Sequence, residues 1–114
     1  ERVFLVGDVI DKVSPLFGQY PKTGQLAAAL GRIAASQIAA RAAGTAAPRE
    51  LPDSTCYVVN RPEPRELTRI ETGYRWRGDG VIQQTVRQQH LPQAGEEDLD
   101  WAHRQFAELL GTTG

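Results

Sequence analysis

A stretch dominated by alanine, residues 26–43, is the feature that most restricts how this chain can fold. Alanine is the best helix former and the stretch contains no proline, so it predicts one long helix. Thr23 before it is a candidate N-cap, and Gly44 after it is a candidate C-cap. Small side chains along such a helix let a neighbouring backbone or a flat cofactor come close, although helix propensity alone also favours alanine.

The residues before this helix predict a strand followed by a loop. The apolar run over residues 2–6 fits a buried strand that ends in a tight turn at Gly7 and Asp8. Residues 11–20 show no sustained period, which indicates a loop. Because the sequence begins inside the apolar strand, without a leader or a helix cap, we expect it to be a piece of a longer protein.

The second half of the chain predicts an antiparallel sheet closed by a helix. After a proline-containing connector, β-branched and aromatic residues mark three strands, over residues 55–60, 66–77 and 81–88. Gly78-Asp79-Gly80 fits a hairpin turn. Acidic residues from Glu96 open a segment with apolar residues at near-helical spacing, which Gly111 ends. The predicted fold class is α+β, with the long alanine-rich helix packed with a three-stranded antiparallel sheet and a C-terminal helix.

Charge and cysteine content argue against several classes of function. The 13 basic and 14 acidic residues leave a net charge of -1, so no strong field draws the chain to nucleic acid or anionic lipid. The alanine-rich stretch carries Arg32 and Arg41 and is too polar to span a bilayer, so no transmembrane segment is expected. The single cysteine, Cys56, cannot form a disulfide within the chain, and the sequence has no metal-ligand cluster of the Cys-x-x-Cys type.

Gly7 and Asp8 form the first motif with a chemical meaning. A carboxylate at a strand tip can accept hydrogen bonds from sugar-like hydroxyl groups, and glycine allows a tight turn and a close approach of the ligand. Residues 3–8 resemble the second FAD signature of flavoproteins with two dinucleotide-binding folds, in which the aspartate binds the ribityl chain. The alternative is an ordinary turn after a strand.

Further blocks extend the resemblance to one family. Pro21-Lys22-Thr23-Gly24, then Gly31-Arg32 in the alanine-rich stretch, then Cys56-Tyr57 are similar to blocks of the flavoprotein subunit of flavocytochrome c sulfide dehydrogenase. The resemblance covers essentially the whole chain. After Cys56 it rests mainly on the strand pattern and on a terminal helix that contains Trp101.

The chain departs from that family in the first turns of the helix. Family members carry Asn and Gln there, whereas this chain has Ala28 and Leu30, and Arg32 replaces a lysine. No flavin contact of the family is therefore assigned to Ala28, Leu30 or Arg32.

The resemblance implies that this chain is the C-terminal part of an FAD-dependent enzyme. Residues 1–44 would end its FAD-binding domain, and residues 45–114 would form a C-terminal domain of the sulfide-dehydrogenase type. The parent protein would oxidise sulfide or a related small sulfur compound in the periplasm and pass electrons to a c-type cytochrome subunit. The sequence has no Gly-x-Gly-x-x-Gly motif for the FAD pyrophosphate, so FAD is expected in the parent protein and not in this piece alone.

The resemblance also implies roles for single residues. Cys56 matches one of two redox-active cysteines, whose disulfide accepts sulfide and whose reduced form passes two electrons to FAD. The other cysteine would lie upstream of this chain. Lys22 and the first amides of the helix would stabilise negative charge on the reduced flavin. These amides belong to Thr23, Gly24 and Gln25.

Other interpretations stay open. Cys56 could be an inert residue, and the helix start could be an ordinary one with a solvated lysine. The parent could be a related flavin reductase that uses a quinone or NADH. A third hypothesis is a non-catalytic interaction module that uses the sheet as its contact surface, for example in a homodimer. The two histidines, His90 and His103, show no pattern of catalytic or metal-binding partners.

Overall fold

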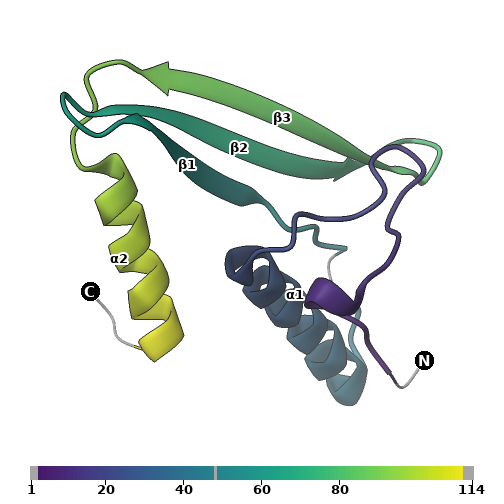
Figure 1. The fold of residues 1–114 in the computed structure, drawn as a ribbon. Helices are drawn as coiled ribbons and strands as arrows, with labels where there is room; N and C mark the ends of the chain where they lie inside the picture. Colours follow the sequence, from purple (N-terminus) through teal and green to yellow (C-terminus); the bar gives the residue numbers. More distant parts are fainter. Residues whose placement is uncertain (1–2, 48, 112–114) are drawn as a thin grey trace. The chain divides into compact units, whose positions relative to one another are not determined.

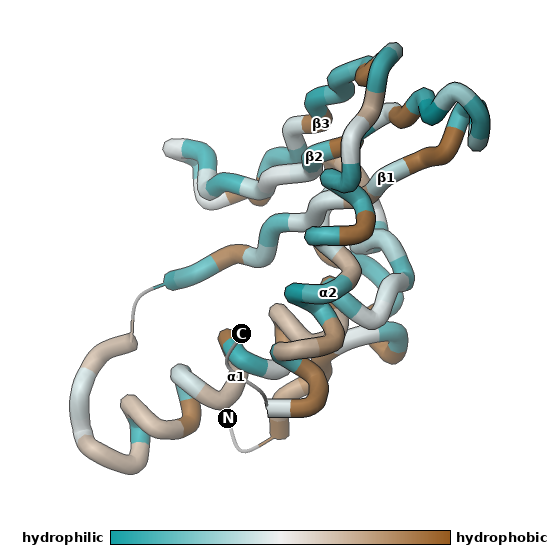
Figure 2. Tube along the Cα trace, turned by 90° about the vertical axis from the view of Figure 1, so that its left-hand side faces the viewer, coloured by the Kyte–Doolittle hydropathy of each residue, from teal (hydrophilic) through white to brown (hydrophobic). Residues whose placement is uncertain are grey.

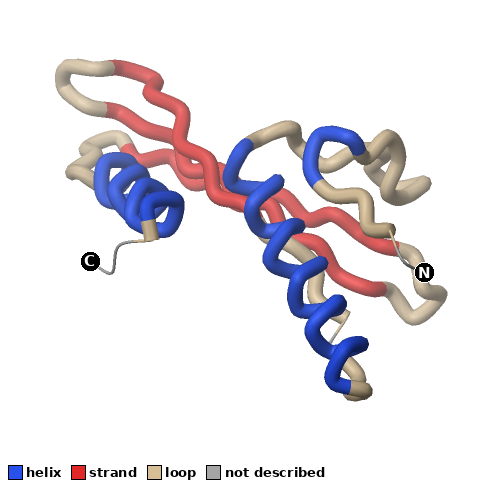
Figure 3. Tube along the Cα trace, turned by 90° about the horizontal axis from the view of Figure 1, so that it is seen from below, coloured by secondary structure: helices blue, strands red, loops and turns tan. Residues whose placement is uncertain are grey.

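The fold contains one long helix, a three-stranded sheet and a second helix, in that order along the chain (Figure 1). The computed structural model describes residues 3–47 and 49–111. The sheet is antiparallel in the order β1-β2-β3, which confirms the predicted α+β class. Its strands are red and the helices blue in Figure 3. The elements are η1 (Gly7–Val9, a 3-10 turn), α1 (Gly24–Ala43), β1 (Ser54–Arg61), β2 (Glu66–Trp76), β3 (Ile82–Leu91) and α2 (Glu97–Leu110).

Helix α1 begins and ends where its capping residues predict. The Thr23 hydroxyl accepts a hydrogen bond from the Leu26 N–H at 3.2 Å, which satisfies one of the amides that a helix start leaves unpaired. Gly44 takes the left-handed conformation, with a φ of 69°, and donates to carbonyls of the last turn. Most residues between the caps are alanine, so α1 is pale along most of its length in Figure 2. Leu26 is the buried residue of this helix.

The strand predicted over residues 2–6 is wrong for the residues that the structure describes, 3–6, while Arg2 lies outside them. Val6 is extended, with a φ of -139°, but no strand forms, and Val3 and Leu5 are exposed. A strand needs a neighbour for its ladder hydrogen bonds. The described strands form a sheet of β1, β2 and β3, and none of them pairs with residues 3–6. The tight turn forms instead as η1, in which the Ile10 N–H donates to the Gly7 carbonyl at 3.2 Å.

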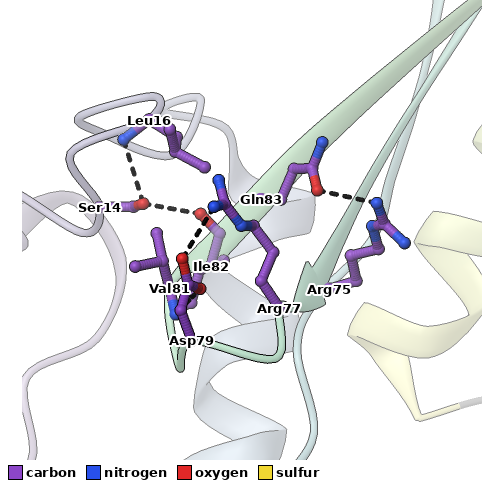
Figure 4. Close-up of polar contacts among 8 residues, drawn as sticks. All are labelled: Ser14, Leu16, Arg75, Arg77, Asp79, Val81, Ile82 and Gln83. Atoms are coloured by element: carbon purple, nitrogen blue, oxygen red, sulfur yellow. Dashed lines mark hydrogen bonds and ion pairs between the residues drawn. The ribbon is translucent and has the colours of Figure 1, made fainter.

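The predicted hairpin between β2 and β3 is confirmed. The Arg77 N–H donates to the Val81 carbonyl at 2.9 Å, and the Gly80 N–H donates to the Arg77 carbonyl at 3.0 Å. Asp79 stabilises the turn, because its carboxylate accepts from the Val81 N–H at 3.1 Å and pairs with Arg77 at 2.8 Å (Figure 4). Strand β3 continues to Leu91 instead of ending at residue 88 as predicted.

By its internal contacts the chain divides into two units. The first comprises residues 1–54 and 72–86, and the second comprises residues 55–71 and 87–114. The assignment of residues 1–44 and 45–114 to two domains of a longer flavoprotein stays a prediction. Over the described residues, no helix combines the length and the apolar character needed to cross a membrane.

In the first unit, the loop before α1 is fixed to the start of β3. The buried Ser14 hydroxyl donates to the Ile82 carbonyl at 2.7 Å and accepts from the Leu16 N–H at 3.2 Å (Figure 4). The Gly18 N–H donates to the Ser14 carbonyl at 2.8 Å and closes the loop. Residues 11–20, which were predicted to form a loop, are therefore a loop that the buried Ser14 hydroxyl ties to β3.

In the second unit, polar and aromatic contacts join α2 to the sheet. Arg65, in the turn between β1 and β2, forms an ion pair with Asp98 in the first turn of α2. This guanidinium holds the pKa of the Asp98 carboxyl below its usual value. The Trp101 ring lies 5.9 Å from the Tyr57 ring of β1, measured between centroids. Leu67 of β2 is fully buried. Helix α2 ends at Gly111, as predicted, and the φ of this glycine is 69°.

Candidate cofactor-binding site

The Gly7 turn lies directly against the start of α1. Gly7 has a φ of 72°, a conformation that side chains with a Cβ rarely adopt. A Cβ built on Gly7 would lie 3.4 Å from the Ala27 Cβ. A glycine in the turn and an alanine on the helix therefore let the two segments approach closely.

Lys22 links the two sequence motifs. Its Nζ donates a hydrogen bond to the main-chain carbonyl of Asp8 at 2.6 Å. The lysine ammonium has three N–H donors, so the other two stay available for a ligand or for water. Through this contact Lys22, which precedes the Thr23 cap of α1, holds the η1 turn next to the start of the helix. The Gly7-Asp8 motif and the Pro21–Gly24 motif therefore lie together.

These residues surround a hollow in the first unit. It is shallow, with a volume of about 10 Å³, which is room for about one water molecule. The Asp8 side chain is exposed, and within the described part of the chain its carboxylate has no hydrogen-bond partner. A carboxylate and an ammonium group that line one hollow can bind a ligand with hydroxyl groups and partial negative charge. The hollow is lined by Gly7, Asp8, Ile10, Tyr20, Pro21, Lys22, Leu26, Ala27 and Leu30.

The structure brings three of the predicted site residues to this hollow, namely Gly7, Asp8 and Lys22. Thr23 and Gly24 are exposed at the adjacent helix start, and Gln25 is partly buried in the first turn. These three residues do not line the hollow. Their amides still carry the partial positive charge of a helix N-terminus, although the Thr23 hydroxyl is already engaged with Leu26.

Cys56 lies on β1, in the second unit, and its side chain is exposed. Its Sγ is 4.0 Å from the Tyr57 carbonyl oxygen, which is a weak contact for a thiol donor. An exposed thiol on a regular strand is accessible to another thiol or to a small sulfur compound. The redox role of Cys56 stays a prediction.

Sequence analysis missed Tyr20, which lines the same hollow as Asp8 and Lys22. Its ring packs edge-on against the Tyr74 ring at 4.7 Å and is tilted against the Phe17 ring at 5.4 Å, measured between centroids. Tyr74 is fixed in turn by the Gln84 amide, which donates to its hydroxyl at 3.2 Å. No local pattern signals these contacts, because Tyr74 belongs to a strand far along the chain.

The raised pKa of Tyr20 predicts how the stability of the chain changes at high pH. Burial, and then the neighbouring Tyr74, raise the pKa of Tyr20 from 10.0 to about 12. The folded chain therefore holds this proton more tightly than the unfolded chain does. The stabilisation is fully present below pH 10 and is lost as the pH rises through about 12. We expect the Tyr20→Phe variant to lose less stability over this interval, measured by urea unfolding at each pH.

An absorbance titration of tyrosinate provides the control for this assignment. The native chain should show a component that titrates at about pH 12, and Tyr20→Phe should lack it. If the variant keeps that component, the assignment to Tyr20 is wrong.

Among the described residues, no group of three or more His, Cys, Asp or Glu side chains is arranged to hold a metal ion. Comparisons of the chain with protein-family models, with curated proteins and with solved structures gave no match.

Proposed function

We propose that this chain is the C-terminal part of an FAD-dependent oxidoreductase that oxidises sulfide or a related small sulfur compound. The observation that carries the proposal is the meeting of two sequence motifs at one hollow, where Lys22 holds the carbonyl of Asp8 at 2.6 Å. Both motifs resemble flavin-binding segments, and their side chains offer the donors and acceptors that such a ligand needs. In this proposal the electrons leave to a c-type cytochrome subunit in the periplasm.

The residues around the hollow offer polar groups to one end of FAD. The hollow itself has a volume of only about 10 Å³, which is room for about one water molecule, so the cofactor would lie over its mouth and not inside it. The exposed carboxylate of Asp8 can accept hydrogen bonds from the ribityl hydroxyl groups. The rest of the cofactor would be held by segments outside this chain.

Each residue would then have a definite task. Asp8 accepts hydrogen bonds and fixes the orientation of the ribityl chain. Lys22 places its remaining N–H donors and its positive charge beside the start of α1, whose dipole has the same sign. Together they favour negative charge at the pyrimidine end of the ligand. FAD, when bound, supplies the two-electron redox chemistry that amino-acid side chains lack.

Cys56 would supply the reaction with sulfur. In the proposal it forms a disulfide with a cysteine outside this chain. Sulfide would attack one sulfur of that disulfide, which would form a persulfide there and release the other cysteine as a thiolate. Departure of the outer sulfur, at the oxidation level of elemental sulfur, would leave two electrons on the cysteine pair, and these electrons would pass to FAD as the disulfide forms again. The exposed position of Cys56 on β1 supports this role, since a buried thiol could reach neither a partner cysteine nor a substrate.

Asp8→Asn tests the proposal in the full-length protein. The amide keeps the shape of the side chain but loses the negative charge, and a hydrogen bond to a charged group is worth about 1.5–3 kcal/mol. We expect the dissociation constant for FAD to rise by about 10- to 100-fold, measured by fluorescence titration of the apoprotein. The fold should survive, because Lys22 binds the main-chain carbonyl of Asp8 and not its carboxylate.

Asp11→Asn is the matched control. Asp11 is also an exposed aspartate, and it contacts Gln19 at 3.4 Å without lining the hollow. This variant should bind FAD as the native protein does. Equal affinities of the native protein and both variants would contradict the role of Asp8, and a native full-length protein without FAD would contradict the proposed function itself.

A second candidate is a non-catalytic interaction module. It is favoured by a stripe of exposed apolar side chains along α2, at positions that share one side of the helix. Leu99, Phe106 and Leu109 in this stripe are 46%, 61% and 79% exposed. This candidate takes precedence if the native full-length protein binds no flavin.

A further inference from the structure

We propose that the outer edge of β1 binds the β1 edge of a second copy of this protein, in antiparallel orientation, and so forms a reversible dimer. The partner is a second copy because the two ends of the strand carry opposite charges, which antiparallel pairing brings together. None of the residues that line the hollow belongs to β1, so the inference goes beyond the proposed function and does not depend on flavin binding.

Strand β1 has an open edge. Among the described strands it has only β2 as a neighbour (Figure 1), so alternate main-chain N–H and C=O groups along its outer side have no strand partner. Val58 and Val59 point to opposite faces of the sheet and are 42% and 51% exposed, so both faces of the strand are accessible at these positions. Such a row of backbone donors and acceptors is a template for another strand.

The composition of β1 does not prevent this pairing. Outer strands that stay single are commonly protected by charged side chains or by proline. Residues 54–60 contain no charged residue and no proline, and Val58 and Val59 are good strand formers. The other outer strand, β3, differs because it carries Arg87, whose side chain is 79% exposed. Of the two outer strands, β1 is therefore the one suited to pairing.

The charges at the two ends of β1 select a second copy as the partner. Asp53 precedes the strand and Arg61 ends it, and each lies four positions from Tyr57. With a two-fold axis at Tyr57, antiparallel pairing places Asp53 opposite Arg61 of the second copy. The symmetry repeats this pair at the other end of the strand. Opposite charges directly across a strand pair are favourable.

The residues between the charges match in the same register. Cys56 lies opposite Val58 of the second copy, and Thr55 lies opposite Val59, so small and β-branched side chains meet across the pair. Parallel pairing in register would instead place each charged residue opposite the same residue of the second copy, which is unfavourable. The charge pattern therefore favours the antiparallel orientation.

The side chains of the charged pair are accessible to a second copy. Asp53 is exposed. Arg61 forms an ion pair with Glu66 of β2, but its side chain remains 57% exposed. A guanidinium has five N–H donors, so Arg61 can bind a second carboxylate without giving up the first.

The test is the dimer dissociation constant of the full-length protein, measured by sedimentation for the native protein and for charge variants. Arg61→Asp would place two aspartates opposite each other at both ends of the pair, so we expect the constant to rise by about tenfold or more. Asp53→Arg should have a similar effect, although it leaves the ion pair of Arg61 with Glu66 in place. The double variant exchanges the charges and should return to within about threefold of the native constant.

Arg87→Asp is the matched control. Like Arg61, Arg87 is an arginine of an outer strand whose exposed side chain pairs with a glutamate of β2, in this case Glu71. This variant should dimerise as the native protein does. Equal weakening by Arg61→Asp and Arg87→Asp would overturn the inference, because it would show an effect of net charge or of stability and not of contact.

Two further outcomes would also overturn it. One is a native full-length protein that stays monomeric up to millimolar concentration. The other is a double variant that dimerises as weakly as the single variants, because the exchanged charges would then not lie opposite each other. Neither outcome bears on the proposed function, which is tested by the binding of FAD to the native protein.

Discussion

Cys56→Ser in the full-length protein is expected to abolish reduction of the flavin by sulfide while FAD stays bound. A serine hydroxyl cannot form a disulfide, so the group that accepts sulfide is lost. Loss of a covalent catalytic group typically lowers a rate by a factor of about 10³ or more. The measurement is the visible spectrum of the flavin during anaerobic titration with sulfide. The native flavin should bleach, and the flavin of the variant should not.

Val58→Ser is a suitable control for this experiment. Val58 lies on β1 with Cys56, is also exposed, and points to the same side of the strand because side chains alternate. The flavin of the Val58→Ser variant should respond to sulfide as the native flavin does. Equal bleaching of the native protein and Cys56→Ser would show that the disulfide role is wrong.

The largest effect on stability is expected for Leu67→Ala. Leu67 of β2 is fully buried, with 0% of its surface exposed, and it shares this state with only Leu26 among the apolar residues that the structure describes. Shortening a buried leucine to alanine usually costs about 2–5 kcal/mol, because transfer energy is lost and a cavity forms. The free energy of unfolding, measured with urea, should fall by that amount. The whole free energy of unfolding of a typical domain is only about 5–15 kcal/mol.

Leu109→Ala provides the comparison. Leu109 is 79% exposed on α2, so little contact is lost when it is shortened. Its free energy of unfolding should change by less than about 0.5 kcal/mol. If the two leucine variants lose equal stability, burial of Leu67 is not what stabilises the sheet.

The elements that were predicted well are those whose signals are local. Thr23 and Gly44 bound α1 because a cap needs only the backbone groups within one helical turn. The hairpin formed at Gly78-Asp79-Gly80 for the same reason, since its hydrogen bonds join residues 77–81. The strand predicted over residues 2–6 had the right composition, but a strand also depends on a neighbour that the described residues do not provide.

The candidate site was predictable only in part, for a related physical reason. Asp8 and Lys22 belong to short motifs, so sequence alone could select them, but it could not show that Lys22 contacts the carbonyl of Asp8. Tyr20 had no motif at all. Its position depends on the rings of Phe17 and Tyr74, and Tyr74 comes from β2. Contacts between distant segments are set by packing, which no local pattern encodes.

The hydrogen bond from Lys22 to the main chain at position 8 has a consequence for how such a site can change. A main-chain carbonyl is present whatever side chain the residue carries, so the Lys22 contact tolerates substitution at position 8. The main chain of residue 8 therefore fixes the turn beside the hollow, whereas its side chain determines which ligands can bind there. Replacing Asp8 would alter which ligands are accepted and leave the supporting turn intact, so new ligand preferences could be selected at this position without redesign of the backbone.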